Sequence, residues 1–265
     1  MALRVIYEPR GRAREYADLA LTVWIGCPHG CIYCFNHSRP RSRYSSAEEM
    51  AAAVKPRANL FDKLRRDCND LKGDGRPVLL QFMGDPYPPQ ERDEEHTAKA
   101  LELMAATGVP FRILTKGGMR AARDFDLYGE GCSFGQTMVF WDEARRVEYE
   151  PHASPLEERI AAFQIAKDHG IRTWCSVEPG WEIGEVLLVI HHLRSVVDEF
   201  FIGRLNEHPL ADTVDWHKFG ALLGGYLKNR GGLRYYIKRS LRPYIPKGVD
   251  YDTREQPTCP HAKGA

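Results

Sequence analysis

The chain has 265 residues, of which 43% are hydrophobic and 28% charged, which supports a folded core and excludes wholesale disorder. Its 37 basic and 36 acidic residues nearly cancel, which excludes a partner recognised through overall charge alone. No apolar run approaches the roughly 20 residues of a membrane helix, and the basic N-terminus lacks an apolar stretch of signal-peptide length. We therefore expect a cytoplasmic protein that does not cross a membrane.

Strands and helices are expected to alternate along the chain. Short apolar runs predict strands at 20–26, 77–83, 109–115, 133–141, 171–177 and 199–203. Ser46, with Glu49 three residues later, predicts the start of a helix after residue 46. Longer amphipathic stretches predict further helices at 59–71, 91–107, 117–126, 154–169, 181–196 and 213–227. Six strands, each followed by a polar or Gly/Pro loop, indicate βαβ units with a parallel sheet, open or closed into a barrel. In either arrangement we expect the chemistry at the carboxyl ends of the strands.

The first predicted strand leads directly into a cysteine motif. Cys27, Cys31 and Cys34 form CxxxCxxC, and an odd total of seven cysteines without an export signal argues against disulfides. Three thiolates on one loop can each bind one iron of a [4Fe–4S] cluster and leave the fourth iron open. The alternative is a zinc site with His29 or His37 as the fourth ligand.

The remaining cysteines are scattered along the chain. Cys68 and Cys132 have no special context, and small buried hydrophobic residues are the usual interpretation. Cys259 lies in a polar tail, where we expect disorder rather than a metal ligand.

Further motifs accompany the cysteines in a fixed order. TVWIGCPHGCIYCFN at 22–36 is followed by GDPY at 84–87, ILTKG at 113–117, RD, EP at 150–151 and PG at 179–180. This series resembles the radical S-adenosylmethionine superfamily, and within it the branch that includes spore photoproduct lyase.

The resemblance implies a fold and an activity. The fold is an α/β partial (β/α)6 TIM-like barrel, here at 19–212, with an N-terminal segment at 1–18 and a basic C-terminal extension and tail at 213–265. The open iron of the cluster would chelate S-adenosylmethionine. Reductive cleavage would then release a 5′-deoxyadenosyl radical that abstracts hydrogen from a substrate. An electron donor such as flavodoxin or ferredoxin is also implied.

The resemblance also suggests cofactor-binding residues. Gly84 and Asp85 would contact the methionine ammonium, although Gly-Asp-Pro is also good turn chemistry. Lys116 would anchor the methionine carboxylate, unless it is an ordinary exposed lysine. Thr137 falls where this branch often carries a serine that touches the cofactor. Glu178 would bind the ribose hydroxyls or cap the next helix.

Two positions near the cluster and the substrate stay open. Tyr33 would pack against adenine, shield the cluster or only pack within its loop. Photoproduct lyase returns hydrogen from a cysteine just before its second-strand motif, but 81–84 contains none, which places photoproduct repair in doubt. Cys175 would donate hydrogen if it points into the barrel, with Ser176 facing the other way; otherwise it is a buried structural cysteine.

The C-terminal region is basic and rich in tyrosine. Residues 217–248 contain no Asp or Glu. Phosphate contacts and base stacking suit a nucleic-acid strand, whereas a solvated face above a packed strand is the alternative. The candidates for nucleic-acid contact are Arg234, Tyr235, Tyr236, Lys238, Arg239 and Arg242, with Arg39, Arg41 and Arg43 as a possible continuation.

The sequence thus predicts a radical S-adenosylmethionine enzyme whose first substrate candidate is DNA or RNA. A radical enzyme that acts on a small molecule or peptide is the alternative. The second alternative is a nucleic-acid-binding protein that is stabilised by zinc and performs no redox chemistry.

Overall fold

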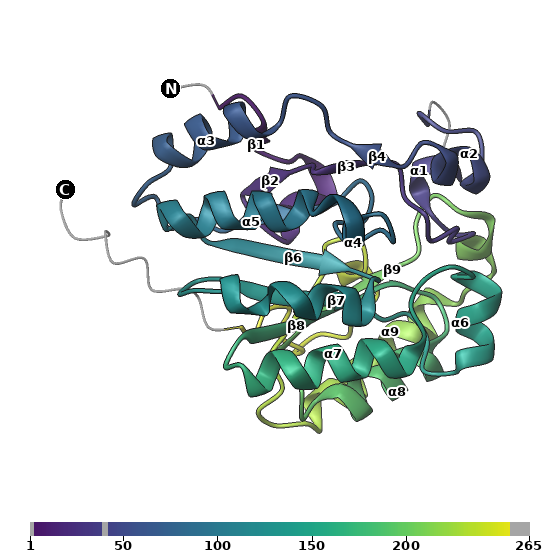
Figure 1. Cartoon of the computed structure of the whole chain (residues 1–265). Helices are drawn as coiled ribbons and strands as arrows, with labels where there is room; N and C mark the ends of the chain where they lie inside the picture. Colours follow the sequence, from purple (N-terminus) through teal and green to yellow (C-terminus); the bar gives the residue numbers. More distant parts are fainter. Residues whose placement is uncertain (1–2, 39–41, 255–265) are drawn as a thin grey trace.

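A curved, mostly parallel sheet forms the centre of the molecule (Figure 1). The computed structural model describes residues 3–38 and 42–254. The sheet has the order β1-β2-β5-β6-β7-β8-β9-β10, in which β1 alone is antiparallel to its neighbour. Its strands are β1 (Ile6–Tyr7), β2 (Leu19–Leu21), β5 (Val78–Leu80), β6 (Phe111–Thr115), β7 (Ser133–Thr137), β8 (Arg172–Gly180), β9 (Glu199–Arg204) and β10 (Tyr235–Ile237). The predicted parallel sheet is therefore confirmed, and its curvature is that of a TIM-like barrel.

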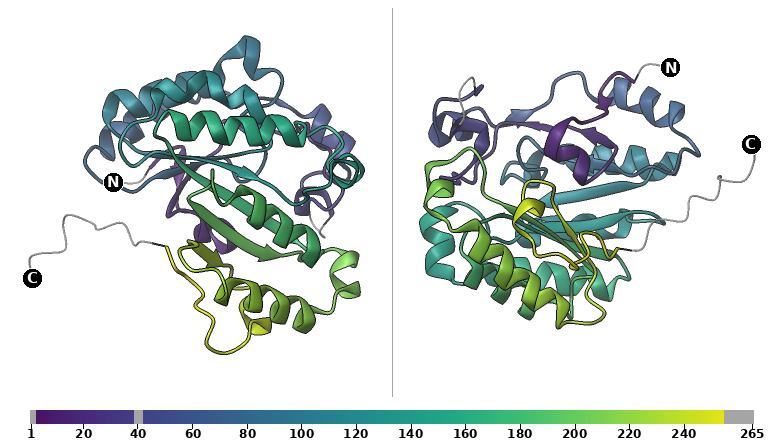
Figure 2. Two further views of the ribbon diagram at one scale, coloured as in Figure 1. Left: turned by 90° about the horizontal axis from the view of Figure 1, so that it is seen from below. Right: turned by 180° about the vertical axis from the view of Figure 1, so that it is seen from behind.

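Helices cover the outer face of this sheet (Figures 1 and 2). The α-helices are α1 (Phe35–Ser38), α2 (Ala47–Ala52), α3 (Phe61–Asp70), α4 (Glu91–Glu94), α5 (His96–Thr107), α6 (Glu143–Tyr149), α7 (Leu156–Asp168), α8 (Ile183–Leu193) and α9 (Trp216–Lys228). The 3-10 segments are η1 (Gly11–Glu15), η2 (Gly118–Leu127), η3 (Pro209–Thr213) and η4 (Arg242–Tyr244). Within the described ranges, none of these helices is both long and apolar enough to cross a membrane.

Side chains fill the inside of the barrel below the strand ends. A small inner cluster unites Ala20, Leu79, Trp174 and Phe201, each from a different strand. The guanidinium of Arg112 lies 4.3 Å from the ring centroid of Trp174 and closes the floor beneath this cluster. Because the barrel interior is packed there, a ligand pocket is expected at the carboxyl ends of the strands.

The predicted strand at 20–26 is wrong in its extent. The chain leaves the main sheet after Leu21, and β3 (Trp24–Ile25) pairs instead with β4 (Lys55–Pro56) in a separate two-stranded sheet. The side chain of Gln81 holds this departure. Its Oε1 accepts hydrogen bonds from the backbone N–H of Val23 and Trp24 at 2.9 and 2.8 Å.

The predicted helices differ from the structure in three places. The helix start at Ser46 is confirmed, since its hydroxyl accepts the backbone N–H of Glu49 at 3.1 Å. The stretch 91–107 is two helices, α4 and α5, because Glu95 takes a left-handed conformation with φ 50°. The stretch 117–126 is the 3-10 segment η2, and α6 was not expected.

Segment η1, near the N-terminus, lies beside β10, near the other end of the described chain (Figure 2). The carboxylate of Glu15 accepts the Tyr236 hydroxyl at 3.0 Å and the backbone N–H of Arg239 at 2.9 Å. The ammonium of Lys238 donates to the carbonyl of Arg12 at 3.2 Å. Segments more than 200 residues apart thus close one side of the barrel together.

The cysteine loop packs tightly against α2, and this contact gives the first testable prediction. Gly26 has φ +80°, and a Cβ there would lie 2.7 Å from the carbonyl oxygen of Met50. Gly73 has nearly the same φ, +81°, but open space around it. Gly73→Ala should cost about 1 kcal/mol through its backbone conformation alone. Gly26→Ala should cost a further ~1–3 kcal/mol because α2 must move.

Urea denaturation of the two variants, side by side with the wild type, measures this difference. An equal loss of stability in both would show that the loop does not press on α2.

Candidate active site

An open-mouthed pocket lies at the carboxyl ends of the strands and contains about 940 Å³ of empty space, its mouth included. Every residue that the sequence suggested for the cluster or the cofactor lines this pocket: Cys27, Cys31, Cys34, Tyr33, Gly84, Asp85, Lys116, Thr137 and Glu178. The loops after successive strands therefore bring these positions together, as the barrel topology requires.

The cysteine loop is held by backbone hydrogen bonds on both sides. On one side the N–H of Cys27 donates to the carbonyl of Met50 in α2 at 3.2 Å. On the other side the N–H of Ile32 donates to the carbonyl of Tyr149 at 3.1 Å, and His152 donates to His29 at 3.1 Å. The loop is thus clamped between α2 and the segment that follows α6.

The donor set fits a cluster better than a single metal ion. Among the described residues, no three His, Cys, Asp or Glu side chains converge closely enough to hold one ion. The cysteines of a [4Fe–4S] cluster can stand farther apart than the ligands of a single ion, because each cysteine binds a different iron. Burial raises the pKa of the Cys31 thiol to about 12, so a bound metal would have to displace its proton.

Neither histidine proposed as a fourth zinc ligand is free. His29 Nε2 lies 2.8 Å from Asp85 Oδ2, and both side chains are buried. His37 Nε2 contacts the carbonyl of Cys31 at 3.0 Å. The zinc alternative therefore lacks its fourth ligand in this arrangement.

Asp85 is fully occupied by the protein itself. One carboxylate oxygen accepts the Thr115 hydroxyl at 2.6 Å and the Tyr87 N–H at 2.8 Å, and the other accepts the Lys116 N–H at 2.7 Å. Burial alone would raise the pKa of Asp85, but His29 and these hydrogen bonds hold it well below its usual range. Asp85 therefore shapes the loops around the pocket, in addition to any contact with a ligand.

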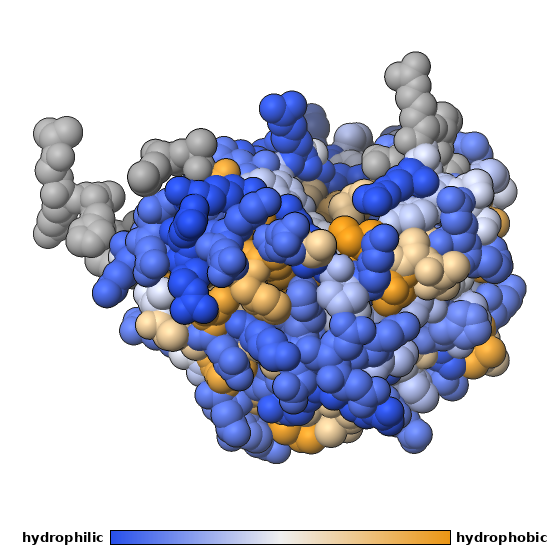
Figure 3. Space-filling model, turned by 45° about the horizontal axis from the view of Figure 1, so that its top comes forward, coloured by the Kyte–Doolittle hydropathy of each residue, from blue (hydrophilic) through white to orange (hydrophobic). Residues whose placement is uncertain are grey.

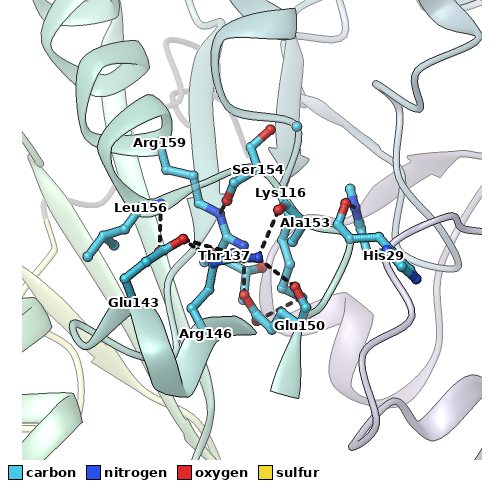
Figure 4. Close-up of polar contacts among 12 residues, drawn as sticks. His29, Lys116, Thr137, Glu143, Arg146, Glu150, Ala153, Ser154, Leu156 and Arg159 are labelled. Atoms are coloured by element: carbon cyan, nitrogen blue, oxygen red, sulfur yellow. Dashed lines mark hydrogen bonds and ion pairs between the residues drawn. The ribbon is translucent and has the colours of Figure 1, made fainter. Parts of the chain in front are cut away.

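A buried ionic network that the sequence analysis did not identify supports the pocket wall (Figure 4). Glu150 is inaccessible to solvent and accepts Arg159 Nη2 at 2.7 Å and the hydroxyl of Tyr33. Arg159 also donates a hydrogen bond to the carbonyl of Thr137 at 3.1 Å, and the ammonium of Lys116 lies 3.6 Å from Glu150. Burial would raise the pKa of Glu150, but the charges of Arg159 and Lys116 lower it to about 2.

A second network lies on the opposite wall. The hydroxyl of Tyr16 donates to Glu178 at 2.8 Å and contacts Ser176 Oγ at 2.6 Å. The ammonium of Lys238 donates to the same Glu178 oxygen at 2.5 Å and lies 3.8 Å from the Tyr16 ring centroid. Glu178 makes no cap for α8, whose N-cap is Glu182.

Cys175 does not point into the barrel, which corrects its assignment as a hydrogen donor inside the pocket. Strand side chains alternate, and on β8 Ser176 and Glu178 line the pocket while Cys175 is buried among the outer core residues. Burial also raises the pKa of the Cys175 thiol well above its usual value. This geometry agrees with the alternative interpretation, in which Cys175 is a buried structural cysteine.

Half of the residues suggested for nucleic-acid contact are buried, which corrects that part of the assignment. Tyr235 and Tyr236 are 5% and 7% exposed in β10, and Lys238 is inaccessible beneath Tyr16. Arg239 is exposed, whereas Arg234 and Arg242 are half-buried. The positions outside the described residues are Arg39, Arg41 and Cys259.

Several site residues carry no local signal in the sequence. Tyr16, Ser176 and Lys238 come from three distant segments, so only the fold shows that they meet. Glu150 belongs to the EP motif, but its burial depends on Arg159 one helix later. Arg204, at the end of β9, also lines the pocket and was not singled out.

The comparisons with known proteins agree with this fold. The model of the Radical SAM superfamily matches residues 21–179. The chain therefore belongs to the radical S-adenosylmethionine superfamily, whose members are enzymes that use S-adenosylmethionine together with a [4Fe–4S] cluster.

Two curated relatives are uncharacterized proteins. One, from Methanocaldococcus jannaschii, is 25% identical over 165 residues, which is 62% of this chain and 60% of that protein. Another, from Mycobacterium tuberculosis, is 25% identical over 162 residues, 58% of this chain and 47% of that protein. The chain thus spans about half to three fifths of the length of these relatives.

Solved structures share the fold at low identity. Spore photoproduct lyase in complex with dinucleoside spore photoproduct has a TM-score of 0.66 and 13% identity, over 89% of this chain and 80% of that chain. SuiB from Streptococcus suis bound to S-adenosylmethionine has a TM-score of 0.61 and 11% identity, over 86% and 52%.

The Glu150 network yields the second prediction. Glu150→Gln leaves Arg159 and Lys116 as buried charges without a carboxylate, and should cost about 3–5 kcal/mol of unfolding free energy. The matched control is Glu148→Gln, which removes an exposed partner of Arg145 at 3.1 Å and should cost less than about 1 kcal/mol. Urea denaturation at pH 7 gives both values.

The pH dependence of stability provides a second measurement on the same variants. A carboxyl group with a pKa lowered from 4.5 to about 2 stabilises the fold above pH 4.5. That contribution disappears as the pH falls from 4.5 toward 2. Over this window the wild type should lose more stability than Glu150→Gln, and parallel curves would contradict the buried ion pair.

Proposed function

We propose that this protein holds a [4Fe–4S] cluster on Cys27, Cys31 and Cys34 and uses it to cleave S-adenosylmethionine reductively. The observation that carries the proposal is that all three cysteines line the same pocket as the strand-end residues of the barrel. When bound, the cluster and S-adenosylmethionine supply an electron and a 5′-deoxyadenosyl radical that abstracts hydrogen from a substrate. An external electron donor, such as flavodoxin or ferredoxin, completes the proposal.

The chain's own residues position the cofactor and exclude water. The ammonium of Lys116 faces the pocket beneath the Tyr33 ring, 5.4 Å from its centroid, and would anchor the methionine carboxylate. Gly84 and Thr137 would contact the rest of the methionine moiety. Glu178, held by Lys238 and Tyr16, would accept the ribose hydroxyls. The packed interior below them keeps solvent from the reacting atoms.

Nucleic acid is the substrate that we propose, with a peptide or small molecule as the second candidate. Arg239 offers an exposed charge beside the barrel, and a structure with this fold was solved with a dinucleoside photoproduct. The peptide alternative has support of the same kind, since SuiB was solved with its precursor peptide. The pocket's own arginines favour the first candidate, as argued below.

The third prediction tests the cluster ligands. Cys31→Ala should lose most of its iron and sulfide after anaerobic reconstitution, because two thiolates do not retain a cluster that needs three. It should then yield no 5′-deoxyadenosine from S-adenosylmethionine and dithionite. Cys175→Ala and Cys68→Ala, which remove buried cysteines outside the pocket, are the matched controls and should keep full iron content. Wild-type iron in Cys31→Ala would end the proposal.

The fourth prediction concerns the cofactor carboxylate. Lys116→Met should weaken S-adenosylmethionine binding tenfold to a hundredfold, since a charge-assisted hydrogen bond contributes about 1.5–3 kcal/mol. Iron content should stay at the wild-type level, because Arg159 still neutralises Glu150. Equilibrium dialysis under anaerobic conditions measures the affinity, with the exposed Lys99→Met as the control. An unchanged affinity would remove Lys116 from the cofactor site.

A further inference from the structure

One arginine at the rim of the pocket lacks the partner that its neighbours have. Among the described residues, three of the four basic side chains that line the pocket pair with a carboxylate: Arg12 with Glu207 at 3.1 Å, His29 with Asp85 at 2.8 Å, and Lys116 with Glu150 at 3.6 Å. Arg204 is the fourth. Within the same part of the chain, it has no carboxylate within ion-pair distance, and its buried Nε has no hydrogen-bond partner.

The side chain of Arg204 is nevertheless held in place. Its guanidinium carbon lies 5.2 Å from the ring centroid of Trp216 in α9 and 5.5 Å from that of Tyr244 in η4. Stacking of this kind fixes the plane of a guanidinium but leaves its N–H groups without acceptors. A buried donor without an acceptor is costly unless a ligand satisfies it. The arrangement is that of a preorganised anion site.

The surroundings favour an anion that carries a flat ring. Phe35 and Phe82 line the same pocket, with ring centroids 5.5 Å apart and a tilt of 37°. The guanidinium of Arg12 lies 5.9 Å from the Phe35 ring centroid. Aromatic faces beside guanidinium groups can bind a base and its phosphate together, as in proteins that bind single-stranded nucleic acids. Figure 3 shows one face of the molecule, on which hydrophilic side chains predominate and apolar groups appear in the hollows between them.

We infer that Arg204 binds a phosphodiester of the substrate at the pocket rim, with Phe35 and Phe82 beside the adjoining base. This deepens the function proposed above, on which it rests, by naming a nucleotide phosphate as the group that the site recognises. A bidentate contact from the guanidinium to two phosphate oxygens would satisfy the Nε that the protein leaves unpaired.

The test compares two probes that differ at one substituent of the phosphorus, an anionic oxygen in one and a neutral methyl group in the other. Thymidylyl-thymidine carries one phosphodiester, and its methylphosphonate analogue has the same bases and sugars without the negative charge. Calorimetric titration of the reconstituted wild type should show at least tenfold tighter binding of the diester. Arg204→Met should reduce that ratio to near one, and Arg204→Lys should retain part of it because the charge remains without the planar fork.

A matched control separates recognition from stacking. Arg230 stacks on Tyr226 at 5.1 Å outside the pocket, so Arg230→Met removes a cation–π contact of the same kind and should leave the ratio unchanged. Iron content and melting temperature, measured on each variant, show whether it has folded. Arg204→Lys keeps the test decisive if Arg204→Met is unstable.

Several outcomes would overturn the inference. These are a wild type that binds both probes equally, an unchanged ratio in a folded Arg204→Met, and a glutamate-rich peptide that binds through Arg204 while the dinucleotide does not. Weaker S-adenosylmethionine binding in Arg204→Met, with the ratio intact, would assign the residue to the cofactor. The titration is run with and without S-adenosylmethionine. Failure of the wild type to cleave the cofactor would overturn the proposed function separately.

Discussion

The buried carboxylate of Glu150 connects most parts of the pocket. It accepts hydrogen bonds from Tyr33 on the cysteine loop and from Arg159 on α7, and it faces the ammonium of Lys116 after β6. Arg159 in turn reaches the carbonyl of Thr137 at the end of β7. Because an unpaired buried charge is so unfavourable, each of these groups has little freedom to move independently. The loop that would carry the cluster is therefore positioned by the sheet.

The opposite wall depends on contacts between residues near the N-terminus and residues in and just after β10. Glu178 receives Tyr16 from the N-terminal region and Lys238 from the segment after β10. Glu15 accepts the hydroxyl of Tyr236, which lies in β10 itself. On this side of the barrel the edge of the sheet at β10 is thus joined to the N-terminal region by polar side chains rather than by pairing between strands. A change at either end of the chain would reach the pocket through Glu178.

Charge pairing inside the pocket distinguishes Arg204 from the other basic groups of the lining. Glu178 pairs with the ammonium of Lys238, and Asp85 lies beside the imidazole of His29, so both acidic side chains of the pocket lining have a basic neighbour. Within the part of the chain that the structure describes, Arg204 has no carboxylate partner, and it is oriented by Trp216 and Tyr244. The pocket lining therefore combines acidic side chains that have basic neighbours with one arginine at the proposed phosphate site.

Local features of the sequence determined the alternation of elements, the cysteine spacing and the loops after the strands. These depend on residues close together in the chain, and the loops meet because parallel strands share one carboxyl edge. Tertiary structure alone decided which way Cys175 faces, since a shift of one residue in a strand exchanges its two faces. It also decided that Lys238 lies inside the barrel and that Glu150 pairs with Arg159. From the sequence alone a charged residue is predicted to be exposed to solvent. Its burial becomes stable only through contact with a partner that is distant in the chain.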